Sequence, residues 1–417
     1  MKLRSFLFTL VVMLITQSIH TQVTIGSGLT PMDGSLLQLK EKEPAGTDIT
    51  TATKGLGLPR VSLKSLYISD PAMEISSTID GAPSQKWDKN EHIGLLVYNI
   101  NQCVDFSNKA DGPFVWDGTK WQILKPITES DVLSYYEDTR EQVHGAQLYP
   151  YRDFGAAGVW MLENMRYLPT DNSFTASAGG DYNYDAKYYF YPNGNPAEPA
   201  VMPSTWSPQL GILYTYSAVT MGVQDGSNDL QGEGNPSEND ILTNPIQGIC
   251  PPGWHVPSDT EWNVLEKEIY DNAGKYSIYS TTDLADINVW NPISATDSWN
   301  NGWNTGSGSG LGWGLRGSAG TGGHTTAMLS QCAVPGSIYL PVTGKSNSWK
   351  DGGFNALLTG WAFGGTMRVY GRATGFWSAS SFLPISAWHR QMGEGRPTAN
   401  REFISRLYMY SVRCKKD

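Results

Sequence analysis

Few residues of this chain have the types and spacing that metal binding requires. Asp225, Ser227 and Asp229 alternate within a polar segment, and their oxygen atoms are the donors that calcium prefers. Leu230 stands where the calcium loop of an EF-hand needs glycine, and no glutamate follows at the twelfth position. We interpret residues 225–240 as a solvated acidic loop, with a calcium site as the alternative. The isolated His324 has no partner at metal-ligand spacing, so we predict no metal site and no cofactor.

Patterns that indicate catalysis are also missing. The sequence contains no Gly-x-Ser-x-Gly and no phosphate-binding glycine loop. A glycoside hydrolase needs two facing carboxylates, and the acidic residues here lie mostly in loops with no pair whose placement the sequence supports. We therefore predict that the protein is not an enzyme. An enzyme acting on extracellular polysaccharide is the alternative.

Aromatic residues offer a different chemistry, which is binding by stacking. Tyr182–Tyr191 is dense in tyrosine, and residues 290–323 combine glycine with tryptophan. Such side chains provide apolar area with a polar tip, although tyrosines equally suit a buried strand. We expect the loops 171–239 and 291–323 to contact a ligand. The predicted ligand-binding residues are Tyr188, Tyr189, Trp299, Trp303 and Trp313.

The elements that position these loops are organised around one helix. Ser258 and Glu261 form a capping box, which predicts a helix that starts at Asp259 and ends near Tyr270. Asp259 places a negative charge in the first turn, where the helix dipole favours it. Trp262, Leu265 and Ile269 then form one apolar stripe. Short strands should follow, with Phe376 and Trp377 in the core and a last strand over 405–414.

The N-terminus and the composition indicate an exported protein. Lys2 and Arg4 precede an apolar run over 6–15, which is too short to span a membrane, so we predict a signal peptide at 1–22. No cysteine follows that run and no other apolar run approaches 18 residues, so no membrane span is expected in the mature chain. The net charge of −10 argues against nucleic acid as a partner. Oligomeric state is not predicted.

The rest of the chain divides into two parts. Residues 23–126 contain short strand-like runs separated by turns, and Asp117-Gly118 predicts a hairpin in which Trp116 and Trp121 pack across the strands. Polar residues 127–146 are interpreted as a linker. Residues 147–417 form the second domain. Four cysteines in an exported chain favour disulfides, and three pairings are open.

The motif Cys250-Pro251-Pro252-Gly253-Trp254-His255, the segment 159–167 and the terminal Ser411-Val412-Arg413-Cys414 resemble the Fibrobacter succinogenes major paralogous domain family. More distantly, residues 253–261 with the C-terminal strand resemble the formylglycine-generating enzymes. These resemblances imply an α+β, C-type-lectin-like domain with short helices and twisted antiparallel strands, preceded by the small β-rich module. They imply a Cys250–Cys414 disulfide, with Cys103 and Cys332 either paired or free. The redox cysteine pair of the enzymes is not matched.

The N-terminal module in turn resembles those of secreted Bacteroidetes surface proteins and some tail-fibre-like stalks, through Gly94-Leu95-Leu96-Val97-Tyr98-Asn99 and Trp116-Asp117-Gly118-Thr119-Lys120-Trp121. We therefore expect a non-enzymatic, secreted or cell-surface binding or adhesion protein that recognises a glycan or a protein through aromatic loops. A structural tip or fibre subunit of a surface assembly is a further alternative.

Overall fold

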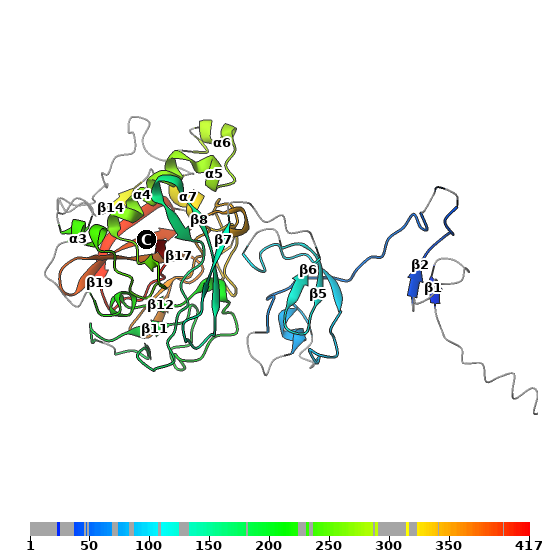
Figure 1. Cartoon of the computed structure of the whole chain (residues 1–417), viewed down its shortest axis with the longest axis horizontal. Helices are drawn as coiled ribbons and strands as arrows, with labels where there is room; N and C mark the ends of the chain where they lie inside the picture. The colour runs from blue at the N-terminus through cyan, green and yellow to red at the C-terminus, as the bar shows by residue number, and fades with distance from the viewer. Residues whose placement is uncertain are drawn as a thin grey trace, which may run out of the picture. The chain divides into compact units, whose positions relative to one another are not determined.

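The computed structural model describes residues 23–25, 37–45, 47, 50–68, 74–82, 87–106, 110–124, 133–180, 182–223, 231–232, 237–286, 288–290, 314–316, 323–340, 342–394 and 396–417. The chain divides into a unit of residues 1–59 and a larger unit of residues 60–417 (Figure 1). In the first, β1 (Val23–Ile25) pairs in parallel with β2 (Leu37–Leu39). The expected signal peptide, 1–22, lies outside the described residues.

The larger unit begins with a four-stranded sheet in the order β3-β4-β5-β6. Its strands are β3 (Arg60–Val61), β4 (Leu96–Asn99), β5 (Gly112–Trp116) and β6 (Trp121–Ile123). Trp116 and Trp121 are paired across the β5–β6 hairpin, and their rings meet edge to face at 5.6 Å between centroids. Both side chains are buried, so the predicted hairpin and its cross-strand packing are confirmed. We call residues 60–124 the β-module.

Residues 133–417, the major domain, contain the remaining sheets. A five-stranded sheet has the order β13-β20-β9-β8-β7, and a four-stranded sheet has the order β14-β19-β18-β17. The strands of the first are β7 (Ser134–Asp138), β8 (Gln147–Asp153), β9 (Val159–Met161), β13 (Trp254–His255) and β20 (Lys415–Lys416). Those of the second are β14 (Gly314–Arg316), β17 (Ala373–Ser381), β18 (Ser386–Gly393) and β19 (Arg396–Ser405). The smaller sheets contain β10 (Thr175–Ala176), β11 (Tyr188–Phe190), β12 (Leu213–Tyr214), β15 (Trp361–Phe363) and β16 (Thr366–Arg368).

The helices are short except for one. They are α2 (Tyr216–Thr220), α3 (Glu238–Thr243), α4 (Asp259–Asp271), α5 (Ala273–Tyr276), α6 (Thr281–Ala285) and α7 (His324–Met328), with 3₁₀ turns η1 (Ile75–Thr78), η2 (Gly155–Ala157), η3 (Pro208–Leu210) and η4 (Trp349–Asp351). Among the described residues, strand exceeds helix, which agrees with the expected mixed class. No helix in these ranges is long and apolar enough to cross a membrane.

Helix α4 forms as the sequence predicts. The Ser258 hydroxyl accepts from the Glu261 N–H at 3.1 Å, and the Glu261 carboxylate accepts from the Ser258 N–H at 2.9 Å, so the capping box is present. Trp262, Leu265 and Ile269 are buried. The helix packs against β17 and β18, and Phe376 and Trp377 of β17 are fully buried, as expected. Burial of this apolar stripe against a sheet is the main stabilisation of a helix of this length.

Two disulfides fasten the larger unit. Cys250 is bonded to Cys414, which confirms the pairing that the family resemblance implied. Cys103 is bonded to Cys332, a pairing that the sequence left open. The turn before α4 also needs Gly253, whose φ of +80° is a left-handed conformation that other residues rarely adopt.

Two expected boundaries differ in the structure. The segment interpreted as a linker, 127–146, contains β7, which pairs with β8 as the edge of the five-stranded sheet. The last long strand was expected over 405–414, but β19 ends at Ser405. The residues after it make single bridges to three separated segments, Ala362, Tyr214 and Phe376, and so do not extend one ladder.

Candidate functional site

A cleft of about 940 Å³ lies between the β-module and the major domain, within the larger unit. Two loops of the β-module, 62–67 and 101–106, form one wall. The other is formed by the loop 204–209 of the major domain and by residues 331–336, Leu340 and Val342. The volume is at the upper end of the range for ligand sites, about 300–1,000 Å³. The cleft is therefore large enough for an elongated ligand such as several linked sugar units.

Asparagine side chains hold the loops of the β-module in place. Asn99 is fully buried at the end of β4, and its side-chain oxygen Oδ1 accepts from the Leu63 N–H at 3.0 Å. The Asn101 amide donates to the Leu63 carbonyl at 2.7 Å. These bonds join loop 62–67 to loop 101–106 and satisfy buried backbone groups. The module wall is therefore built before any ligand binds.

Loop 101–106 is fastened to the major domain at several points. The Cys103–Cys332 disulfide crosses between the two walls. The Lys350 ammonium pairs with the Asp105 carboxylate, and the Trp349 indole N–H donates to the Asp105 carbonyl at 3.0 Å. Phe106, at a positive φ of 57°, is buried within the core of the major domain. A residue keeps such a strained backbone conformation only where the surrounding packing holds it in place. Loop 101–106 is therefore fixed rigidly to the major domain.

The wall from the major domain is centred on Trp206. Its indole N–H donates to the Gly211 carbonyl at 2.7 Å, and its ring stacks on His144 with centroids 5.1 Å apart. His144 also contacts the Tyr191 hydroxyl, at 3.2 Å from its Nε2. Burial, and then the charge of Arg166, lower the pKa of His144, so the imidazole is neutral at pH 7. Trp206 is thus held rigidly, with an edge at the cleft.

Tyr67 joins the main cleft to an annex of about 260 Å³, which is lined by His144, Gln147 and Met202. Its ring is 41% exposed, the largest aromatic exposure in the walls of either space. Burial of its hydroxyl, with the charges of Glu163 and Asp105, raises the pKa of Tyr67 above 10.0. The phenol is therefore protonated at neutral pH and available as a hydrogen-bond donor.

The acidic groups near the cleft are paired. Glu163 accepts from Arg166 at 2.7 Å, and both are buried. Arg166 also donates to the Leu148 carbonyl at 2.8 Å. Asp105 is bound by Lys350, and Asp80 lies 3.8 Å from Lys64. Among the described residues, no group of three or more His, Cys, Asp or Glu side chains is placed to hold a metal ion.

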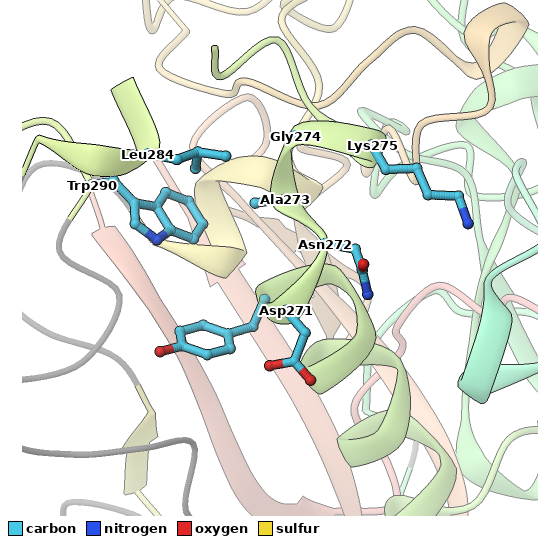
Figure 2. A pocket seen from close by; sticks show the side chains of 8 residues that line it. Asp271, Asn272, Ala273, Gly274, Lys275, Leu284 and Trp290 are labelled. Carbon is cyan, nitrogen blue, oxygen red and sulfur yellow. The ribbon is translucent and has the colours of Figure 1, made fainter. Parts of the chain in front are cut away.

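A second, smaller pocket of about 370 Å³ lies where α4 is followed by α5 (Figure 2). Trp290 and Leu284 form its apolar side, and Asp271, Asn272 and Lys275 lie along the other. The Trp290 ring packs edge to face on Tyr279, at 5.0 Å between centroids. This pocket adjoins the start of the predicted tryptophan loop in sequence.

The residues predicted from sequence fall into two groups. Trp299, Trp303 and Trp313 lie outside the described residues, as does most of the acidic loop 225–240. Tyr188 is half-buried in β11, and Tyr189 is 8% exposed and packs in the core against Tyr191. The strand role of these tyrosines is therefore established, and ligand binding by them remains a prediction.

The cleft residues Tyr67 and Trp206 were not singled out by the sequence analysis. Trp206 falls in the predicted contact loop 171–239, so its region was identified but the residue was not. Tyr67 has no local signal, because the wall that it faces is formed by residues more than a hundred positions away.

Comparison with known families gave two matches. The Fibrobacter succinogenes major domain matches residues 156–416, and the phage tail like trimerisation region matches residues 24–135. Comparison with curated proteins and with solved structures found no match. The first match spans more than half of the chain and includes the Cys250–Cys414 disulfide, helix α4 and the C-terminal Arg413. The chain therefore belongs to the Fibrobacter succinogenes major domain family.

Proposed function

We propose that this protein is an exported, non-enzymatic binding protein that holds a glycan chain in the cleft between the β-module and the major domain. The observation that carries the proposal is the pre-formed cleft itself, with aromatic Tyr67 and Trp206 among hydroxyl and amide side chains. Those polar side chains are Ser65, Ser77, Asn101, Ser204, Thr205, Ser207, Gln209 and Gln331. Aromatic rings that bind the apolar face of a sugar, together with groups that bind its hydroxyls, match the chemistry of a glycan.

Rigidity of the walls supports binding rather than a closing motion. The disulfide Cys103–Cys332 and the buried Phe106 fix the loop of the β-module. Trp206 is fixed by its hydrogen bond to the Gly211 carbonyl and by stacking on His144. A pre-organised site loses less entropy on binding, which favours affinity. Since Asp80 and Asp105 each have a lysine partner, we propose no acid–base role for them.

We also propose that the major domain is C-type-lectin-like, and that the protein acts at the cell surface or outside the cell. Two disulfides fit an oxidising compartment. This proposal includes a signal peptide at 1–22 and an origin in a Bacteroidetes-type bacterium.

A glycan array with the purified chain, followed by calorimetric titration of a retained oligosaccharide, tests the cleft. We expect Tyr67→Ala to weaken binding about tenfold or more, equivalent to about 1.4 kcal/mol. Tyr135→Ala is the matched control, because Tyr135 is 38% exposed on β7 and does not line the cleft. Equal affinity of both variants would exclude the cleft, and loss on Trp299→Ala or Trp303→Ala instead would place the site in loop 291–323.

The same oligosaccharide tests the absence of turnover. After prolonged incubation with the protein, mass spectrometry should find it unchanged. Shortened products that disappear with the variant Asp105→Asn would show an enzyme acting on polysaccharide.

A second candidate function is a structural subunit of a surface fibre. The match of residues 24–135 to a trimerisation region of phage-tail type favours it. In that case the array would retain no glycan, while the purified chain would form ordered assemblies visible by electron microscopy.

A further inference from the structure

The β-module presents an apolar strip on the outer face of its sheet. Along β4 the side chains alternate, so Val97 and Asn99 are buried while Leu96 and Tyr98 are 38% and 37% exposed. Ile100, which continues the alternation, is 48% exposed. In a typical half-buried strand the outward positions are polar. Here they are apolar at three successive outward positions.

Neighbouring strands extend the strip. The register places Val115 beside Leu96 and Pro113 beside Tyr98, so the outward positions of β5 continue the same face. Leu124 follows β6, is 54% exposed, and bonds through its N–H to the Pro113 carbonyl at 2.8 Å. The inward positions Phe114, Trp116 and Trp121 fill the core of the module. The outer strip is therefore separate from the core and from the cleft walls.

Charge is scarce on this face. Arg60 of β3 lies beside Tyr98, and Gln122 lies beside Val115 on β6. Exposed apolar side chains at adjacent strand positions are a common mark of a protein–protein contact. For a chain of net charge −10, a nearly neutral face is also where like-charged copies repel one another least.

We propose that the outer strip, defined as Leu96, Tyr98, Ile100, Val115 and Leu124, is a contact through which three copies of this chain associate. The occupant is another copy because the matched trimerisation region, 24–135, contains all of these residues. Around a threefold axis each copy buries its outer strip against its neighbours. The major domains follow the strip in sequence, so one assembly carries three of them. Three linked sites gain avidity without any new contact to ligand.

This inference does not depend on what the cleft binds. An apolar strip buried in a trimer gives a mass near three times that of one chain, whether or not a glycan is recognised. Glycan binding and assembly are therefore measured separately, and either can fail alone.

The test is sedimentation equilibrium of the full exported chain over a hundredfold range of concentration. We expect a trimer for the natural chain and a monomer for Tyr98→Glu/Ile100→Glu, which would bring six carboxylates together at the contact. The control is Tyr182→Glu/Val201→Glu, which also introduces two glutamates, at positions 76% and 57% exposed in the major domain. It should remain trimeric. Intact disulfides and an unchanged circular dichroism spectrum establish that each variant is folded.

Three results would overturn the proposal. They are a monomeric natural chain throughout the range, a dimer in place of a trimer, and a strip variant that stays trimeric while folded.

Discussion

The substitution Asp259→Asn tests how the major domain is held together. Asp259 begins α4 and is fully buried, where its carboxylate pairs with two arginines of the neighbouring sheet. Arg401 reaches it at 2.5 Å and 2.9 Å, and Arg390 pairs with its other oxygen. Arg390 also donates at 2.5 Å to Glu266, which lies further along α4. One carboxylate thus joins the helix to both β18 and β19.

The expected cost follows from removing the carboxylate that two buried guanidinium groups share. Asparagine keeps the size of the side chain but removes its negative charge, so both guanidinium groups lose their shared partner. Breaking a buried pair in this way costs about 3–5 kcal/mol. In the natural chain burial lowers the pKa of Arg390, but the carboxylates of Asp259 and Glu266 raise it more, so this guanidinium is charged. With an unfolding entropy of about 2.1 cal/mol/K per residue, the 358 residues of 60–417 give about 0.75 kcal/mol/K. The Tm should then fall by about 4–7 °C.

Urea titration and differential scanning calorimetry measure this loss. Asp271→Asn is the control, since Asp271 is on the same helix, is half exposed and pairs with Lys267 one turn away. Such a surface pair contributes about 0.3–0.5 kcal/mol. If Asp259→Asn loses less than about 1 kcal/mol, or no more than Asp271→Asn, the buried network does not hold the helix and the reasoning is wrong.

Three other perturbations have defined outcomes. His255 lies between Glu261 at 3.1 Å and Asp417 at 2.7 Å, and although burial lowers its pKa, these carboxylates raise it more, to above 6.5. The stabilisation that the charged His255 provides is complete below pH 6.5 and is lost as the pH rises through the pKa of the folded state. The difference in unfolding free energy between the natural chain and His255→Gln should therefore shrink from pH 6 to pH 9. Replacing both Cys103 and Cys332 by serine removes one disulfide, and the unfolding free energy measured by urea titration should fall by about 2–5 kcal/mol. Proteolysis between 101 and 133 should also become faster. An unchanged urea midpoint would mean that the buried Phe106 is sufficient to hold the loop. Ser258→Ala removes the cap of α4 and should cost about 1 kcal/mol, whereas Ser280→Ala, which caps the short exposed α6, should change global stability by less than half of that.

The sequence predicted local structure around α4 but not the role of its first residue. Ser258, Glu261 and the stripe of Trp262, Leu265 and Ile269 are separated by a few positions, so the helical period alone relates them. Asp259 was assigned to the helix dipole on the same local basis. Its partners Arg390 and Arg401 lie 131 and 142 positions away. No periodicity within one element connects such residues, and only the packing of α4 on β18 and β19 brings them together.

The cleft could not be predicted from the sequence for a similar reason. Its walls come from loops at 62–67, 101–106, 204–209 and 331–336, each of which looks like an ordinary turn segment in isolation. The polar residues 127–146 indicated a linker between the β-module and the major domain, and a linker predicts no contact between the parts that it joins. Phe106 shows why that separation is incomplete, because its side chain belongs to the core of the domain that begins after it.

The residues that carry the family resemblance have structural roles, and this bears on function. Arg413 is fully buried and donates to the Asn164 side chain at 3.1 Å and to the Asn355 carbonyl at 3.1 Å. Trp254 packs on Tyr151, and Cys414 closes the disulfide to Cys250. None of these side chains lines the cleft. Membership of the family therefore describes how the domain is closed. In the proposed function, binding rests instead on loop residues such as Tyr67 and Trp206, which lie outside the shared motif.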